Sequence, residues 1–168
     1  MKKLLFLIPV LIVSVILLSL SHNSSDTKFK KEALDTKLMS FDGSEVAFKN
    51  IVEKHKGKTL VIEIWASWCG DCVKNMPNVK ELQDNNPNTD FVFLSCDKTD
   101  AAWKAGIEKH QINGDHYLIP DGMKGDFGKA LDLNWIPRYI VVDKKGKIAL
   151  YKAIETDHEQ VKSLLKSL

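Results

Sequence analysis

The sequence lacks an excess of charge of either sign. It has 24 basic and 22 acidic side chains, and Lys2 and Lys3 account for the net charge of +2. A protein that binds nucleic acid needs a surplus of basic residues on one face to contact the phosphates. We therefore expect no nucleic-acid partner. Internal repeats and low-complexity segments are also lacking, and the 44% apolar content is sufficient for one core.

Cysteine is scarce, and its number is odd. The three cysteines are Cys69, Cys72 and Cys96, which excludes a simple framework in which every cysteine is paired. A structural zinc site needs about four ligands, but neither a second Cys-x-x-Cys motif nor a histidine pair at ligand spacing is present. One close pair and one single thiol remain, and the pair is the candidate for chemistry.

The N-terminus is the one long stretch without charge. Residues 4–20 follow a short basic start and would be about 26 Å long as a helix. That length is marginal for a bilayer core of about 30 Å, and slightly long for the roughly 7–15 apolar residues of a cleaved signal. We expect residues 1–21 to be a signal peptide or a membrane anchor, with both fates open. Residues 22–34 are predicted to be a linker and residues 35–168 one domain.

Extended and helical patterns alternate along this domain. The patterns predict a hairpin over residues 38–48, strands over 59–65, 91–95, 139–142 and 148–151, a short extended piece over 117–119, and helices from near Cys69, over 100–110 and over 127–133. A capping box from Thr156 to Glu159 is expected to open a C-terminal helix. This order predicts an α/β fold with a central mixed sheet covered by helices on both faces.

The motif Cys69-Gly70-Asp71-Cys72 lies where a buried strand is expected to pass into a helix. Unpaired backbone N–H groups and the positive end of the helix dipole stabilise a thiolate at this place. Since only the thiolate attacks a disulfide, a lowered pKa would make Cys69 a nucleophile near neutral pH. Cys72, one turn further on, would be less exposed and close enough to resolve a mixed disulfide. The motif therefore predicts a redox-active pair.

Residues 65–72, Trp-Ala-Ser-Trp-Cys-Gly-Asp-Cys, resemble the active-site signature of the thioredoxin superfamily. The apolar N-terminus and the extra segment before the last hairpin are similar to its TlpA/ResA-like, membrane-tethered branch, over roughly residues 35–168. The resemblance implies a thioredoxin-like fold with an N-terminal hairpin and a central insertion. It also implies thiol–disulfide oxidoreductase activity without an organic cofactor or metal.

Further positions match the pattern of that superfamily. Ile136-Pro137 matches its cis-proline loop, which together with Trp68 is expected to contact substrate. Pro77 matches the kink proline of the active-site helix. Glu63, in the middle of an apolar strand, matches a buried acid that exchanges a proton with the second cysteine. Burial should raise the pKa of this carboxyl, so we predict general acid–base work for it.

Two positions depart from the pattern. Asp71 stands where thioredoxin has proline, and its negative charge beside the nucleophile favours a reductant over a strong oxidant. Asn75 stands three residues after the second cysteine, where ResA-like members carry glutamate, and this puts a narrow cytochrome-maturation role in doubt.

The N-terminal segment predicts an extracytoplasmic enzyme, whose substrates would be exported proteins with disulfides. The resemblance implies an upstream membrane dithiol that supplies electrons. Two rival functions are weighed. A Cu(I) metallochaperone would use the same thiolates, with Met76 one turn away. A thiol peroxidase would need a Pro-x-x-x-Thr-x-x-Cys setting, which does not surround Cys69.

The remaining reactive side chains are expected to be structural. Cys96 ends an apolar strand and is predicted to be a small buried hydrophobe, with a regulatory or resolving thiol as the alternative. Four histidines without metal-ligand spacing are expected at the surface: His55, His110, His116 and His158.

Overall fold

The computed structural model describes residues 27–168, so the expected signal or anchor lies outside the described residues. One sheet of seven strands runs through the middle, in the order β2-β1-β5-β4-β3-β6-β7. The strands are β1 (Lys37–Ser40), β2 (Glu45–Ala47), β3 (Thr59–Trp65), β4 (Thr89–Ser95), β5 (Asp115–Leu118), β6 (Arg138–Val142) and β7 (Ile148–Ala153). The mixed α/β fold expected from the sequence is confirmed.

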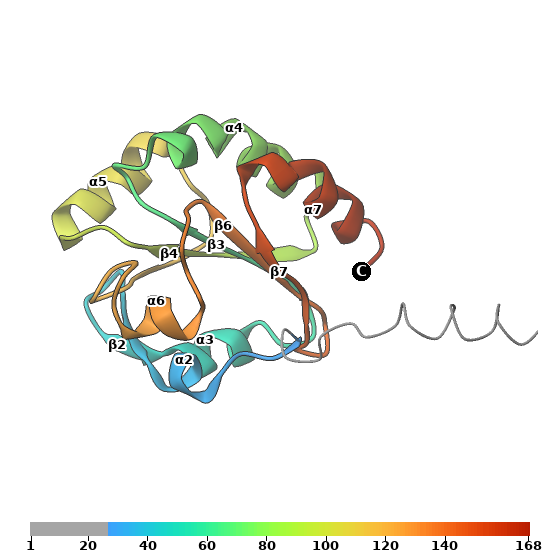
Figure 1. Ribbon diagram of the computed structural model, residues 1–168. Coiled ribbons are helices and arrows are strands. Elements are labelled where there is room, and N and C mark those ends of the chain that lie inside the picture. The colour runs from blue at the N-terminus through green and yellow to red at the C-terminus, as the bar shows by residue number, and fades with distance from the viewer. Residues whose placement is uncertain (1–26) are drawn as a thin grey trace, which may run out of the picture.

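Helices cover both faces of this sheet. They are α2 (Lys31–Asp35), α3 (Phe48–Lys54), α4 (Gly70–Asn85), α5 (Asp100–His110), α6 (Asp126–Ala130) and α7 (His158–Leu165), with a 3₁₀ turn, η3 (Glu155–Asp157), before the last one. Figure 1 shows α4, α5 and α7 on one face, and α2, α3 and α6 on the other. Within residues 27–168, no helix has the length and apolar character needed to cross a membrane.

The centre of the sheet is parallel. β3 pairs in parallel with β4, and β4 with β5, so α4 and α5 are the crossover helices. All seven residues of β3 are buried, as expected for a strand covered on both faces. β6 pairs antiparallel with the other edge of β3, with Ile64 opposite Arg138. The start of β6 therefore lies beside the end of β3, from which the chain continues to the cysteine pair.

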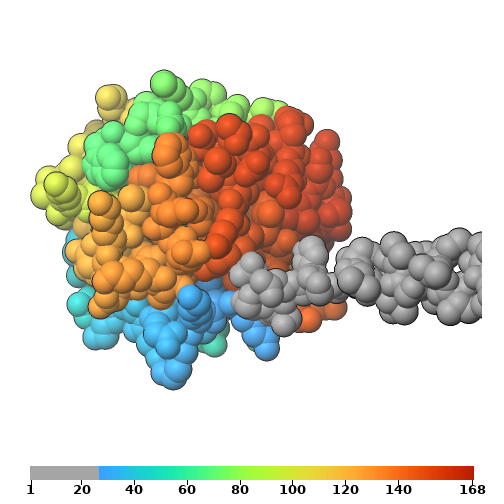
Figure 2. All heavy atoms as spheres, in the orientation of Figure 1, coloured from blue at the N-terminus to red at the C-terminus, as the bar shows by residue number. Residues whose placement is uncertain are grey.

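The N-terminal part of the chain adds an edge to the sheet and a cover beneath it. β1 and β2 form the expected hairpin, and β1 joins the sheet through β5. The rings of Phe48 and Phe127 lie 5.1 Å apart, which packs α3 against α6, and Phe29 contacts Phe48 at 4.9 Å. In the space-filling view the blue atoms of the N-terminal part lie directly below orange atoms of the C-terminal half of the chain (Figure 2).

Two short helices and one helix start differ from the sequence-based expectation. Helices α2 and α3 were not predicted, and α2 lies partly within residues 22–34, the segment expected as a linker. The capping box expected from Thr156 to Glu159 is wrong. The chain first tightens into η3, the Asp157 carboxylate accepts a hydrogen bond from the Ile154 N–H at 3.0 Å, and α7 begins at His158.

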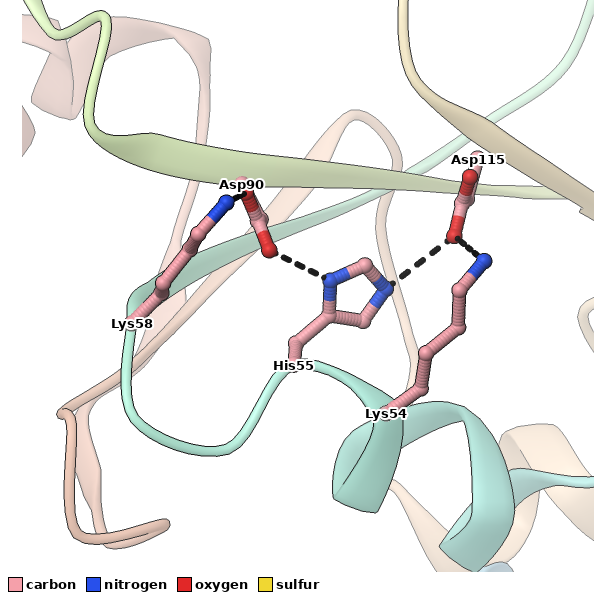
Figure 3. A network of polar contacts seen from close by, with 5 residues as sticks. All are labelled: Lys54, His55, Lys58, Asp90 and Asp115. Carbon is pink, nitrogen blue, oxygen red and sulfur yellow. Dashed lines mark hydrogen bonds and ion pairs between the residues drawn. The ribbon is translucent and has the colours of Figure 1, made fainter.

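His55 is buried, contrary to the expectation of a surface side chain. Its Nδ1 donates to Asp90 Oδ2 at 2.8 Å, and its Nε2 lies 3.2 Å from Asp115 Oδ2. Lys58 and Lys54 contact the same two carboxylates at 2.9 and 2.6 Å (Figure 3). The network joins the end of α3 to the first residues of β4 and β5, at the end of these strands opposite the cysteine pair. One imidazole thus links the carboxylates of two neighbouring strands.

Replacing this imidazole should destabilise the fold. We expect His55→Leu to lower the free energy of unfolding by about 2 kcal/mol, because both carboxylates lose a buried partner. The exposed neighbour Lys56 provides the control, since Lys56→Leu should change little. Urea unfolding of the two variants measures the difference, and equal losses would contradict a specific role for the His55 network.

The same network makes a pH dependence testable. Burial opposes ionisation of Asp90, but hydrogen bonds from His55 and Lys58 outweigh it and lower its pKa below 3.8. A lowered carboxyl pKa contributes stability above the unfolded value, and this contribution is lost as the pH falls through the folded value. The difference between the protein and the His55→Leu variant should therefore shrink below about pH 4.

Candidate active site

Cys69 and Cys72 lie where β3 passes into α4. The chain leaves β3 at Trp65, turns through residues 66–68 and enters α4 at Gly70. Cys69 is the N-cap of α4, and its Sγ accepts a hydrogen bond from the Cys72 N–H at 3.1 Å. The two cysteines form a disulfide, with their Cα atoms 5.2 Å apart. A helix N-terminus is the place where backbone N–H groups stabilise negative charge, and here one of them points at a sulfur.

The two cysteines differ in how completely they are buried. Cys69 retains 7% of its surface exposed, whereas Cys72, in the first turn of α4, has none. An incoming disulfide can therefore reach only the first cysteine. The arrangement has the asymmetry that dithiol exchange needs, with one sulfur to attack and one to resolve.

The loop before β6 lies against the cysteine pair. The Ile136-Pro137 peptide bond is cis, as expected from the sequence, and the Ile136 carbonyl oxygen lies 3.6 Å from Cys69 Sγ. Ile136 and Pro137 are themselves buried. Next to them, the exposed Trp135 donates from Nε1 to Glu155 at 3.3 Å. Trp68 is also exposed, so aromatic side chains flank both chain segments at the site.

Glu63 is buried in the middle of β3. It is 1% exposed, and neither carboxylate oxygen accepts a hydrogen bond from any described residue. Burial alone raises its pKa from 4.5 to about 8. Such a carboxyl is protonated at neutral pH and close to its titration point, which suits proton exchange. The expected burial of Glu63 and the resulting rise in pKa are confirmed.

A polar contact beneath α4 was missed by the sequence analysis. Tyr139 pairs with Glu63 across β3 and β6, and its hydroxyl accepts a hydrogen bond from Asn75 Nδ2. Asn75 Oδ1 in turn accepts from Asn78 Nδ2 at 2.8 Å. Burial raises the pKa of Tyr139, so its hydroxyl stays protonated. The only sequence signal for Tyr139 is its position two residues after Pro137.

The third cysteine is unsuited to nucleophilic work. Cys96 is buried, and burial, with smaller contributions from Asp97 and Asp121, raises the pKa of its thiol to about 12. It therefore stays protonated at neutral pH. Met76, the candidate third copper ligand, belongs to the hydrophobic core. Within residues 27–168, no three His, Cys, Asp or Glu side chains are grouped to hold a metal ion.

The raised pKa of Glu63 predicts a stability that falls with pH. The folded protein binds this proton more tightly than the unfolded chain, so the contribution is full below about pH 4.5 and is lost as the pH rises through about 8. We expect the protein to lose roughly 2–5 kcal/mol of unfolding free energy over this range relative to a Glu63→Gln variant. Urea unfolding at several pH values measures the difference, and parallel pH curves for the two proteins would contradict the assignment.

Comparison with known proteins adds to this geometry. The Redoxin family matches residues 28–168. The thiol-disulfide oxidoreductase ResA of Bacillus thuringiensis subsp. konkukian (strain 97-27) is 25% identical over 140 residues, or 82% of this chain and 77% of the relative. Sporulation thiol-disulfide oxidoreductase A of Bacillus subtilis (strain 168) is 21% identical over 127 residues, or 74% of each chain. The resemblance to ResA-like proteins is thus confirmed.

Solved structures share the fold. A Bacteroides vulgatus protein described as a thiol-disulfide oxidoreductase has a TM-score of 0.64 and 30% identity, over 80% of this chain and 87% of that one. A Chlorobium tepidum protein described as a thiol:disulfide interchange protein DsbE has a TM-score of 0.67 at 18% identity, over 84% and 96%, which shows the fold alone. With its cysteine pair at the head of a helix, the chain belongs to the Redoxin family, as a thiol–disulfide oxidoreductase of the thioredoxin fold.

Proposed function

We propose that the protein reduces disulfides of exported proteins outside the cytoplasm, with Cys69 as the attacking sulfur and Cys72 as the resolving one. The observation that carries this proposal is the unequal burial of two bonded cysteines at one helix N-terminus, where Cys69 retains 7% exposure and Cys72 has none. The basic start and uncharged stretch of residues 1–21 support the extracytoplasmic setting.

The reaction proceeds in two exchanges. The Cys69 thiolate attacks one sulfur of a client disulfide, forms a mixed disulfide and releases the other client sulfur as a thiolate. Cys72 then attacks Cys69 Sγ, forms the Cys69–Cys72 disulfide and releases the second client thiol. Two electrons pass from the enzyme to the client. An upstream membrane dithiol restores the reduced pair by the same chemistry in reverse.

Glu63 is the proposed proton acceptor in the second exchange. Cys72 is fully buried, so its thiol must lose a proton inside the protein before it attacks. Glu63 precedes the pair on the buried strand β3, has no hydrogen-bond partner among the described residues, and has a pKa near neutral pH. With a pKa of about 8, roughly one Glu63 side chain in ten is ionised at pH 7. This carboxylate form takes up the proton of Cys72, and the carboxylic acid form returns it during the next cycle.

The client chain is proposed to bind along the cis-proline loop. The Ile136 carbonyl oxygen lies beside Cys69 Sγ, and an extended client segment can pair with backbone groups at this place. The exposed indole of Trp68, the residue before Cys69, adds apolar contact area. Ile136, Pro137 and Trp68 are therefore the proposed client-binding residues.

Asp71 supports the direction of electron flow. Asp71 stands between the two cysteines in the sequence, and its side chain is about half-exposed. The Lys74 Nζ lies 4.0 Å from Asp71 Oδ1. A negative charge beside Cys69 disfavours its thiolate, which destabilises the reduced pair and makes it a stronger reductant. We expect a potential near the thioredoxin value of about −270 mV, rather than the value of about −120 mV of a strong oxidant.

Insulin reduction in the presence of dithiothreitol tests the function. The protein should catalyse it, whereas Cys69→Ser and Cys72→Ser should not, and Cys96→Ser, the matched control, should remain active. A Cys72→Ala variant should accumulate mixed disulfides, which mass spectrometry identifies. Absence of catalysis together with tight Cu(I) binding by the pair would favour the metallochaperone instead.

Equilibration with glutathione measures the reduction potential of the Cys69–Cys72 pair, and a value above about −180 mV would reject the reductase direction.

Single-turnover kinetics test the role of Glu63. Glu63→Gln should slow resolution of the mixed disulfide roughly tenfold or more, because the Cys72 proton loses its acceptor. Formation of the mixed disulfide by Cys69 should stay within about twofold of the unmodified protein. Rapid-quench measurements resolve the two steps, and an equal loss in both would reject the proton-transfer role.

A further inference from the structure

Asp97 is a buried carboxylate that contacts the segment leading to Cys69. It lies two residues after β4 and is 3% exposed. Its Oδ2 accepts hydrogen bonds from the Ser67 N–H at 3.0 Å and from the Ser95 hydroxyl at 2.7 Å, and its Oδ1 accepts from the Ser67 hydroxyl at 2.7 Å. Two of these three bonds therefore hold one residue of the turn between β3 and α4.

Hydrogen bonds, rather than an ion pair, compensate the charge of Asp97. Among the ion pairs of residues 27–168, none includes this carboxylate. A buried carboxylate is costly unless its oxygens are hydrogen-bonded, and bonds to a charged acceptor are stronger than neutral ones. Moving Ser67 away would leave this charge poorly compensated, so the turn is held firmly in place.

Two further contacts confine the same turn. A Cβ atom on Gly106 of α5 would lie 2.7 Å from the Ser67 Cβ, so the helix packs as closely as a glycine allows. The Cys96 N–H donates to the Trp65 carbonyl at 2.8 Å and ties the end of β4 to the end of β3. Ser67 is thus enclosed between Asp97 and α5.

The enclosed turn determines where the Cys69 sulfur lies. The Cys69 N–H donates to the Ala66 carbonyl at 3.1 Å, which links the turn directly to the cysteine backbone. From there the sulfur reaches the Cys72 N–H and approaches the Ile136 carbonyl oxygen. A shift of the Ser67 backbone would therefore move the Cys69 sulfur, because only Trp68 separates the two residues.

We propose that Asp97 is a positioning residue for the Cys69 sulfur, acting through its hydrogen bonds to Ser67. This role rests on the proposed function, in which Cys69 is the nucleophile. The hydrogen bonds that this carboxylate accepts come from Ser67 and Ser95, not from Cys69 or Cys72. It keeps the turn at residues 66–68 in the conformation that holds the sulfur against the helix N-terminus.

Loosening of the turn should raise the pKa of the Cys69 thiol. A turn that is free to move holds the sulfur less closely to the Cys72 N–H, so the thiolate is less stabilised and the pKa of the thiol rises. Removal of the negative charge of Asp97 without any movement would have the opposite effect. The direction of the change therefore distinguishes a positioning role from a purely electrostatic one.

Ser67→Ala and Ser95→Ala form a matched pair for the test. Each removes one hydroxyl donor to the same carboxylate and leaves its charge, but only Ser67 belongs to the turn. Ser95→Ala also removes the acceptor of the Asp97 N–H, so it is the more severe change at Asp97 itself. In the reduced protein, the pH dependence of Cys69 alkylation by iodoacetamide should shift upward for Ser67→Ala, with a rate at neutral pH about threefold to tenfold lower. Ser95→Ala should react at the unmodified rate, and Asp97→Asn should shift in the same direction as Ser67→Ala.

Urea unfolding of each variant excludes global unfolding as the cause. An unchanged or lowered thiol pKa in folded Ser67→Ala would overturn the proposal, as would an equal shift in Ser95→Ala. If Asp97→Asn does not fold, the comparison of Ser67→Ala with Ser95→Ala still tests the proposal. Alkylation does not depend on turnover, so failure of the unmodified protein to reduce insulin would reject the proposed function separately.

Discussion

The contact on which the site depends is the hydrogen bond from the Cys72 N–H to the Cys69 sulfur. It exists because a fully buried strand, β3, ends within a few residues of a long helix, α4, and leaves Cys69 as the N-cap. A free N–H group at a helix start must find an acceptor, and here the acceptor is the sulfur that reacts. The end of β3 determines where α4 begins. The start of α4 in turn determines that Cys69, rather than Cys72, keeps some exposure to solvent.

The same strand contains a buried side chain, Glu63, that destabilises the fold, and the packing of the rest of the core must offset this free energy. Glu63 occupies a position in β3 where an apolar side chain would pack without penalty, yet its oxygens have no hydrogen-bond partner among the described residues. Its neighbours in the strand, Ile62 and Ile64, are fully buried. An unpaired polar group in such surroundings destabilises the fold. Its retention is understandable if the carboxyl serves the chemistry, since local rules are broken mainly at functional sites.

Local patterns predicted those parts of the fold whose cause is local. Strand β3 and helix α5 match the expected residues at both ends, because a long apolar run predicts a buried strand and eleven residues rich in alanine and without proline predict a helix. Helices α2 and α3 have five and seven residues and bury only one or two side chains each. This is too few for the helical spacing of apolar residues to be recognised in the sequence. The Cys-x-x-Cys motif is equally local. The contacts of Asp97 with Ser67, His55 with Asp90, and Asn75 with Tyr139 join residues 30 to 64 positions apart, which periodicity cannot reveal.

The pairing of β6 with β3 has a consequence for how this site can vary. Because Glu63 lies opposite Tyr139 and Ile64 opposite Arg138, the proline loop at the start of β6 and the buried acid in β3 share one ladder. A slip of this ladder by one residue would turn the Tyr139 side chain to the other face of the sheet and displace the proline from the sulfur together with it. An insertion or deletion in β6 should therefore disrupt the site, whereas substitutions and changes in the surrounding loops leave this register intact.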